Sequence, residues 1–405
     1  MSETLRPETA EQAREAVAYA LQEESPLEIR GEGSKRGFGA PCRTNQVLDT
    51  TGLSGITLYE PEELVLSARA GTPLRIIQAA LDEKGQQFAF EPLDLPALYG
   101  GAPGSGTIGG LVATNLAGSR RIAQGAARDH VLGIHCVTGR GEAIKSGGRV
   151  VKNVTGYDLS KLMTGAHGTL ALLTDVTLKV LPKAEECWTL MLEGLDAEGG
   201  VRALCDGLGS PHEVSGAAHL PADIADLAPV PAVAKAGTSA TLLRLEGPLA
   251  SVEARSAGLA AELGDRAQII RLESDESRAL WSFVSNARAF ATKPETPLWK
   301  VSVKPTDGPK LIALLAAKGM PGRHFFDWGG GLVWFEAAAD VEAASLRAIV
   351  ANVGGHATLI RADAPTRARV PVFHPLSGAT AALSKRIREA FDPKTILNPG
   401  RMGGG

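Results

Sequence analysis

The sequence has few cysteine and aromatic residues and no strong excess of either charge. Four cysteines, Cys42, Cys136, Cys187 and Cys205, occur in 405 residues, and no pair of them has the spacing of a zinc or iron–sulfur site. We therefore expect a reducing compartment, thiols that pack as small apolar groups, and no metal bound by this chain. The formal net charge of −3 gives no support for nucleic-acid binding.

Long apolar runs are also absent. No segment approaches the ~20 apolar residues that a membrane-spanning helix needs, and the polar, acidic start of the chain has no apolar core of a secretory signal. We expect a cytoplasmic protein, with peripheral docking on a membrane complex left open. An apolar content of 44% is typical of a soluble protein with a substantial core, and the length favours two or three domains.

Glycine, by contrast, is concentrated in the stretch Pro103–Gly118. Glycine lets a ligand approach the main-chain N–H groups, and several such groups together attract a phosphate. A GxGxxG match begins at Gly104, with Asp129 further on, but the prolines in Glu91–Gly101 argue against the buried strand that a Rossmann fingerprint requires. We interpret the stretch as a cofactor-binding turn of another fold. A glycine-rich turn without a ligand is the competing interpretation.

A second glycine-rich turn, Gly31–Lys35, follows a short predicted strand, Pro26–Arg30. Lys35 or Arg36 can add positive charge to it. The rest of this half alternates short strands and helices, with a helix expected at Thr107–Leu116. Further predicted elements are a strand at Asp129–Thr138 and a strand pair or one long strand at Gly168–Val180. This mixture indicates an α+β fold in which the two glycine-rich turns frame one site.

After Pro182 the pattern becomes regular. It predicts two βαββαβ units of the ferredoxin-like type, joined by a helix at Asp275–Phe290. The predicted strands are Cys187–Leu192, Glu213–Leu220, Ala240–Glu246, Ala267–Leu272, Leu298–Val303, His324–Trp328, Leu332–Phe335 and Ala357–Arg361. The predicted helices of the two units are Gly200–Leu208, Leu249–Leu263, Pro309–Lys318 and Val341–Val353. A last helix, Pro375–Phe391, precedes a proline–glycine tail.

Several segments resemble the FAD-linked oxidases of the vanillyl-alcohol oxidase and p-cresol methylhydroxylase (PCMH) type, in that family's order. They are Arg30–Ser34, Gly106–Gly110, Ala113–Asn115, Gly165–Leu170 and Asn398–Gly400. The resemblance implies a PCMH-type FAD-binding domain at 1–182, an α/β cap (substrate) domain of ferredoxin-like units at 183–370, and a C-terminal segment, 371–405, that returns to complete the FAD site.

The same resemblance implies a set of residues that bind FAD, mostly in the two glycine-rich turns. They are Gly31, Glu32, Gly33, Ser34, Lys35, Pro92, Gly106, Thr107, Ile108, Gly109, Gly110, Ala113, Thr114, Asn115, Gly118, Gly168, Leu173 and Asn398. Glu32 stands where the family more usually has glycine. Family members with covalent flavin attach it through His or Cys in the first glycine-rich loop, and residues 31–39 contain neither, so we expect non-covalent FAD, although Cys42 is near.

Within that family the likeness is to the FAD-binding, E-type subunits of bacterial glycolate oxidases. It is carried by Gly125–Gly133, Val151–Leu159, Leu298–Val303, Asp327–Gly330 and Phe391–Met402. It implies oxidation of glycolate, or of D-lactate, and electron transfer through partners. The implied partners are the homologous D-type flavin subunit and the F-type iron–sulfur subunit of glycolate oxidase.

A 2-hydroxy acid needs a cation for its carboxylate and a base for its hydroxyl proton. The candidates in the second half are Lys300, Lys304, Arg323, Arg361, His324, His356 and His374. We favour His374 and Lys300, while a structural or solvated role is the alternative for each.

The sequence contains no HxH or HxxH pair of the kind that binds metal in related 2-hydroxy-acid oxidases. This absence keeps a second hypothesis open, a flavin-bearing scaffold or electron relay for another catalytic subunit. An NAD-dependent dehydrogenase ranks well below both hypotheses.

Overall fold

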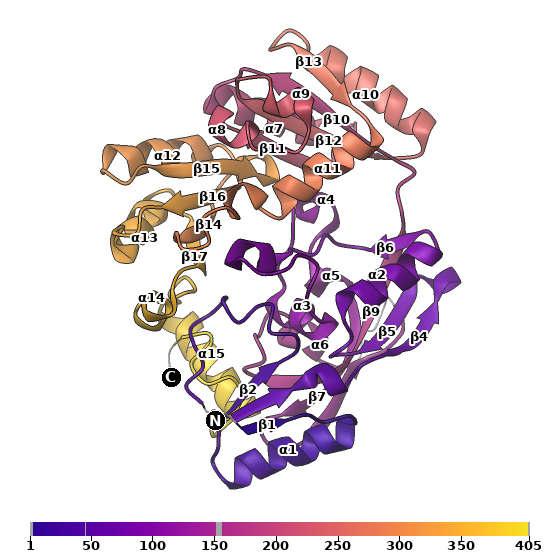
Figure 1. The fold of residues 1–405 in the computed structure, drawn as a ribbon, viewed down its shortest axis with the longest axis vertical. Coiled ribbons are helices and arrows are strands. Elements are labelled where there is room, and N and C mark those ends of the chain that lie inside the picture. The colour runs from indigo at the N-terminus through magenta and orange to yellow at the C-terminus, as the bar shows by residue number, and fades with distance from the viewer. Residues whose placement is uncertain (1–2, 45, 151–155, 404–405) are drawn as a thin grey trace.

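The computed structural model describes residues 3–44, 46–150 and 156–403. Figure 1 shows an elongated molecule: the first half of the chain lies below, the second half lies above, and the last segment returns to the lower half. Within the described ranges, no helix combines the length and the apolar character needed to cross a lipid bilayer. The first five residues of the motif Val151–Leu159 lie outside the described residues.

The chain begins with a small parallel sheet covered by one helix. Its strands, in the order β1-β3-β2, are β1 (Glu3–Leu5), β3 (Gln46–Asp49) and β2 (Leu27–Arg30). Helix α1 (Ala10–Gln22) buries Ala13, Val17 and Ala20, which helical spacing places on one face, against Leu27 and Leu48 of the sheet. The strand β2 therefore enters the first glycine-rich turn from a fixed position.

A six-stranded sheet forms the rest of the lower half. The strand order is β4-β5-β9-β7-β8, and β6 pairs with β9. The strands are β4 (Ile56–Glu60), β5 (Val65–Arg69), β6 (Gln86–Phe88), β7 (Val131–Thr138), β8 (Ala143–Gly147) and β9 (Ala171–Pro182). Its helices are α2 (Leu74–Glu83), α3 (Ile108–Thr114), α4 (Arg121–Gln124), α5 (Ala127–His130) and α6 (Leu159–Met163). The segment predicted as a strand pair or one long strand is the single strand β9.

The strand predicted from Asp129 begins two residues later, at Val131. Asp129 belongs to the short helix α5, and its Oδ2 accepts a hydrogen bond of 2.8 Å from the main-chain N–H of Ala126. A carboxylate that accepts from the first turn of a helix stabilises that helix rather than a strand. The apolar alternation that follows was correctly predicted as a strand, which is β7.

The upper half is one eight-stranded sheet, ordered β13-β10-β12-β11-β15-β16-β14-β17. Its strands are β10 (Glu186–Glu193), β11 (Gly216–Leu220), β12 (Ala240–Gly247), β13 (Ile269–Leu272), β14 (Leu298–Ser302), β15 (Gly322–Asp327), β16 (Leu332–Ala337) and β17 (His356–Arg361). The helices of the two units are α7 (Ala197–Gly209), α10 (Leu249–Leu263), α12 (Asp307–Ala317) and α13 (Ala343–Asn352). Each unit has the ferredoxin-like strand order, and β11 pairs antiparallel with β15 to join them. The two predicted units are confirmed.

Local backbone conformations shift two predicted boundaries in this half. Glu213 has a left-handed φ of 51°, so β11 starts at Gly216 instead of at Glu213. Helix α11 (Ser274–Ser285) ends early because Ala287 is left-handed at φ 48°. Two short helices that were not predicted, α8 (Ala222–Ala225) and α9 (Pro231–Ala234), lie between β11 and β12.

A buried ion cluster joins the lower half to the upper half. Arg244 of β12 contacts Glu91 (Nη1 to Oε1, 3.1 Å) and Glu246 (Nε to Oε2, 3.3 Å), while Arg120 contacts Glu246 through Nη2 at 2.6 Å. Arg244 also lies over the Trp281 ring. Because the buried Arg244 and the partly buried Glu91, Arg120 and Glu246 each have an opposite partner, the cluster fixes the two halves against each other.

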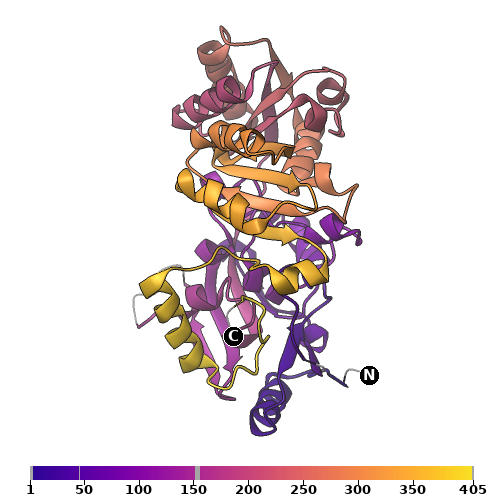
Figure 2. The same ribbon diagram turned by 90° about the vertical axis from the view of Figure 1, so that its left-hand side faces the viewer.

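The C-terminal segment returns to the first sheet, as the fold class predicted. Figure 2 shows α14 (Ala364–Arg369) and α15 (Gly378–Phe391) descending from the upper half to the lower one. Beyond α15, Leu397 pairs in parallel with Leu27 of β2, and the N–H of Leu27 donates to Ile396 O at 2.7 Å. The tail is therefore an ordered neighbour of β2.

Candidate functional site

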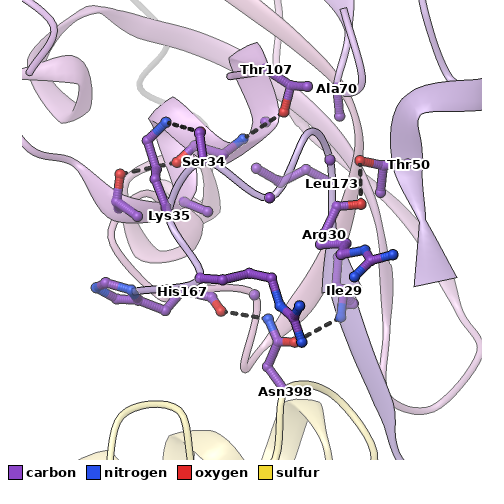
Figure 3. Close-up of a pocket in the computed structure, with 18 of the residues that line it drawn as sticks. Ile29, Arg30, Ser34, Lys35, Thr50, Ala70, Thr107, His167, Leu173 and Asn398 are labelled. Atoms are coloured by element: carbon purple, nitrogen blue, oxygen red, sulfur yellow. Dashed lines mark hydrogen bonds between the residues drawn. The ribbon is translucent and has the colours of Figure 1, made fainter. Parts of the chain in front are cut away.

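A cavity lies where β2, the two glycine-rich turns, β9 and the C-terminal tail meet (Figure 3). It contains about 770 Å³ of unfilled space, counting its open mouth. The lining residues are Ile29, Arg30, Gly31, Glu32, Gly33, Ser34, Lys35, Arg36, Phe38, Thr50, Ala70, Thr107, Gly109, Gly110, Ala113, Thr114, His167, Gly168, Ala171, Leu173, Asn398 and Arg401. Segments from both ends of the sequence thus build one site.

The two glycine-rich turns touch each other at this cavity. A Cβ on Gly31 would lie 2.5 Å from Thr107 Oγ1, and a Cβ on Gly109 would lie 2.8 Å from the main-chain oxygen of Ala70. Thr107 caps α3, with its Oγ1 accepting from the N–H of Gly110 at 3.3 Å. These contacts leave no room for side chains, so the cavity is lined there by backbone.

Lys35 supplies a positive charge to the wall. Its Nζ donates to Ser34 Oγ at 3.2 Å (Figure 3), and it forms no ion pair with another described residue. Burial lowers the pKa of Lys35 to about 8, while the charges of Asp94 and Glu32 act in the opposite direction. A lysine without a paired carboxylate beside exposed backbone suits an anionic ligand.

Asn398 and Arg401 hold the tail in the wall. The N–H of Ile29 donates to Asn398 Oδ1 at 2.7 Å, and Asn398 Nδ2 donates to the oxygen of His167 at 2.8 Å (Figure 3). Arg401 donates to the oxygens of Arg36 and Phe38 and pairs with Glu28 at 3.1 Å. The tail is therefore part of the site.

His167 is buried in the wall in a left-handed conformation, at φ 53°. Its ring packs edge-on against Phe38, with centroids 5.1 Å apart, and against Phe373, at 4.8 Å. Burial, and then the charge of Arg401, lowers the pKa of His167 to about 3, so the imidazole is neutral. An uncharged aromatic wall of this kind suits a planar ligand.

Five of the predicted cofactor residues do not line this cavity: Pro92, Gly106, Ile108, Asn115 and Gly118. Ile108 is fully buried in the core. Asn115 ends α3 in a left-handed conformation, and its Oδ1 accepts from the N–H of Arg128. Pro92 pairs with Ala117 in an isolated bridge on the Glu91 side, where Gly118 donates to Glu91 O.

The remaining predicted cofactor residues all line the cavity. Other lining residues lay outside the predicted cofactor set: Ile29, Arg30, Arg36, Phe38, Thr50, Ala70, His167, Ala171 and Arg401. Of these, Arg36 was expected to add charge to the first turn, and Arg30 lies in the motif Arg30–Ser34. His167 lies inside the motif Gly165–Leu170, which was a usable signal. Arg401 directly follows the motif Asn398–Gly400, whereas Thr50 and Ala70 had no local signal.

The favoured candidate Lys300 belongs to a separate cationic cluster. Its Nζ lies 4.6 Å from the centre of the Trp328 ring, and Arg121 Cζ lies 4.6 Å from the same centre. In the described part of the chain, neither cation has a carboxylate at ion-pair distance. Burial and then the charge of Arg121 lower the pKa of Lys300 to about 8, against the opposing effect of Asp327.

Hydrogen bonds hold Trp328 beside the two cations. Its indole N–H donates to the oxygen of Gly118 at 3.1 Å, and its main-chain N–H donates to Asp327 Oδ1 at 2.7 Å. Ser119 donates to the other carboxylate oxygen of Asp327 at 2.7 Å. Burial raises the pKa of Asp327 to about 7 despite these hydrogen bonds.

His374 connects this cluster to the cavity. It follows Phe373, whose ring contacts His167 and Phe38 in the cavity wall, and its own ring lies 6.2 Å from that of His356. Partial burial, followed by electrostatic interactions with His374, Lys300 and Arg121, lowers the pKa of His356. His356 therefore lies near both favoured candidates, His374 and Lys300.

The other candidates lie elsewhere. Arg361 is buried and pairs with Glu336 at 3.0 Å, and Arg323 pairs with the same carboxylate at 3.2 Å. The ring of His324 packs edge-on against Phe326, and Lys304 is exposed. These four residues are structural or solvated.

The cavity fits the cofactor that the sequence resemblance implied. A diphosphate needs backbone without side chains and a cation, which Gly31, Gly109 and Lys35 provide. In the described residues, no group of three metal-ligating side chains comes together. The ligand-accessible backbone beside Lys35 suits a large anionic organic cofactor.

Comparisons with known proteins agree with a cofactor in this cavity. Residues 2–147 match the family model described as an FAD binding domain. Glycolate oxidase subunit GlcE of Escherichia coli K12 is 34% identical over 389 residues, which cover 96% of this chain and 95% of the relative. Glycolate oxidase subunit GlcD of Bacillus subtilis is 28% identical over 196 residues, 48% of this chain and 40% of that protein. A solved structure of p-cresol methylhydroxylase with substrate bound has the same fold, with a TM-score of 0.71 at 17% identity over 99% of this chain and 88% of that one.

Proposed function

Because the chain belongs to the GlcE family of glycolate oxidase subunits, and so to the FAD-linked oxidoreductases, we propose that it is the FAD-binding subunit of an enzyme that oxidises glycolate to glyoxylate. D-Lactate is the alternative substrate. The observation that carries this proposal is the 34% identity over 96% of the chain.

The subunit names of the relatives support an assembly of several chains. The proposed partners are a homologous flavin subunit of the D type and an iron–sulfur subunit of the F type, through which electrons leave and through which the chain docks at a membrane. The absence of cluster-spaced cysteines in this sequence agrees with an iron–sulfur centre on another subunit.

FAD is held non-covalently by the two glycine-rich turns, Lys35 and the tail residue Asn398. When bound, it supplies the chemistry of a two-electron acceptor. The residues of this chain position it: the backbone around Gly31 and Gly109 accommodates the diphosphate, and the ring of His167 forms an uncharged wall.

The proposed position of the substrate carboxylate is beside Lys300 and Arg121, the two cations that contact the Trp328 ring. Charge-assisted hydrogen bonds from both cations would orient a small 2-hydroxy acid. Burial, followed by the charge of Arg347, lowers the pKa of His374, so its ring is neutral near pH 7. His374 Nδ1, which accepts a hydrogen bond of 3.4 Å from the main-chain N–H of Ala357, is the proposed acceptor of the hydroxyl proton once the substrate displaces that contact.

A second function, electron relay or scaffold for a separate catalytic flavin subunit, is favoured by one observation. Within the described part of the chain, no three His, Cys, Asp or Glu side chains gather to hold a metal ion, and the sequence contains no HxH or HxxH pair. Such a subunit would bind FAD fully and leave it oxidised in the presence of substrate.

The test is the absorbance spectrum of the purified chain before and after anaerobic glycolate. Bleaching of the flavin bands supports catalysis by this chain, and Lys300→Ala should then slow bleaching while the exposed lysine variant Lys304→Ala should not. Full FAD occupancy without bleaching favours the relay. A protein that refuses added FAD contradicts both functions.

A further inference from the structure

Glu32 places a negative charge at the wall of the FAD cavity, in a turn where the related oxidases more usually have glycine. Its Oε2 accepts a hydrogen bond of 2.6 Å from the main-chain N–H of Gly106. A carboxylate beside a diphosphate is repulsive at close range unless a cation compensates it. The position of Glu32 therefore needs an explanation.

Arg75, the second residue of α2, supplies the compensating charge. Its Nη1 lies 2.7 Å from the other carboxylate oxygen, Oε1. Burial by itself raises the pKa of Glu32, but the hydrogen bonds from Arg75 and Gly106 and the charges of Arg75 and Lys35 lower it overall. Glu32 is therefore ionised and paired at neutral pH.

The contacts of Glu32 close a ring around the second glycine-rich turn. The oxygen of Gly106 accepts from the N–H of Leu74 at 2.8 Å, and Leu74 directly precedes Arg75. From Arg75 the ring continues to Glu32 and back to the N–H of Gly106. It thus ties the first turn, the second turn and the start of α2 together.

Gly106 has the most unusual backbone conformation in this ring. Its φ of 131° is a conformation that other residues rarely adopt, and a Cβ there would lie 2.7 Å from Ser34 Oγ and 3.1 Å from Lys35 Nζ. Glycine is flexible, so an additional hydrogen bond is needed to hold this turn in one shape. The hydrogen bond from Gly106 to Glu32 fixes it directly beside the cavity lysine.

We propose that Glu32 is a positioning residue that fixes the Gly106 turn in the shape that receives the FAD diphosphate, and that Arg75 is the counter-charge that lets it do so without repelling the ligand. This inference rests on the assignment of the cavity to FAD.

The experiment measures the dissociation constant of FAD for the apoprotein, by flavin fluorescence, over a range of salt concentrations. Arg75→Ala should weaken binding by roughly tenfold at low salt and by less at high salt, because it exposes an uncompensated carboxylate. The double variant Glu32→Gln, Arg75→Ala should regain most of the affinity, since an amide oxygen still accepts from Gly106 and the charge is gone. Lys84→Ala, an exposed lysine just after the same helix, is the matched control and should bind like the wild type.

A second pair of variants distinguishes the effect of the Glu32 hydrogen-bond acceptor from the effect of its negative charge. Glu32→Gln should bind FAD at least as tightly as the wild type, whereas Glu32→Ala, which also removes the negative charge, should bind more weakly because it removes the acceptor for Gly106. Equal affinity of these two variants, or failure of the double variant to recover, overturns the inference. A wild-type protein that binds no FAD overturns the cofactor assignment and the inference together.

Discussion

The side-chain amide of Asn398 donates a hydrogen bond of 2.8 Å to the main-chain oxygen of His167. Through Oδ1 the same side chain accepts from the N–H of Ile29 at 2.7 Å. Both partners line the FAD cavity, and a Cβ on Gly168 would lie only 2.7 Å from Asn398 Nδ2. One buried side chain thus holds two walls of the cavity at once.

Asn398→Ala should weaken FAD binding and destabilise the protein. It leaves a buried N–H and a buried C=O unpaired, at a cost of about 1–3 kcal/mol for each group. Asn398→Asp keeps the acceptor for Ile29 but sets a carboxylate oxygen against the oxygen of His167 and a negative charge at the cavity, so it should weaken FAD binding at least as much. Thermal unfolding of the apoprotein and FAD titration measure both effects, with exposed Asn352→Ala as control. Equal behaviour of the variants at 398 and 352 would contradict the role of Asn398.

The affinity for glycolate should fall as the pH rises through about 8. The ammonium of Lys300 has a pKa lowered to about 8 by burial, so it loses its proton, and its attraction for a carboxylate, above that pH. Lys300→Arg keeps its charge and should abolish this fall. KM for glycolate, measured between about pH 6 and 10 across the titration range of this lysine, tests the prediction. If Lys300→Arg retains the wild-type profile, another group is responsible.

FAD should be released intact when the holoprotein is precipitated with acid. Cys42, the cysteine near the first glycine-rich turn, is a poor nucleophile because burial raises the pKa of its thiol, which lies 3.8 Å from Asn398 Oδ1. Flavin in the supernatant of the wild type and of Cys42→Ser alike is the expected result. Flavin that stays with the wild-type pellet, and leaves that of Cys42→Ser, would show a covalent bond.

Breaking the ion cluster between the halves should destabilise the protein strongly. Arg244→Ala leaves Glu91 without a side-chain cation, while Glu246 keeps Arg120, and the loss of one partner from a buried pair costs up to about 3–5 kcal/mol. Arg14→Ala removes an exposed arginine paired with Glu11 and should change stability little. Urea unfolding of the two variants compares them directly. Similar midpoints would mean that the cluster does not contribute as inferred.

Much of the fold could be predicted because it depends on local pattern. The apolar periodicity after Pro182 gave both ferredoxin-like units, since each strand and helix buries one face. The errors were local conformations: Glu213 and Ala287 are left-handed without being glycine, and Asp129 stabilises a helix turn where alternation indicated a strand.

The site was predictable only where its chemistry is carried by glycine or by a motif. Gly31 and Thr107 could be assigned to one site because glycine-rich turns indicate backbone that a ligand can approach. Arg121, by contrast, has no sequence signal that relates it to Lys300, because only the fold brings both to Trp328. Thr50 and Ala70 were missed for the same reason.

The pairing of the tail with β2 also has a kinetic consequence. Ile29 and Asn398 are 369 positions apart in the sequence, and contacts between such distant positions form slowly, because the chain entropy lost in closing a long loop must be offset first. The cavity is complete only after both ends of this span have met. A molecule can therefore capture the cofactor only late in folding, after both ends of the chain have met.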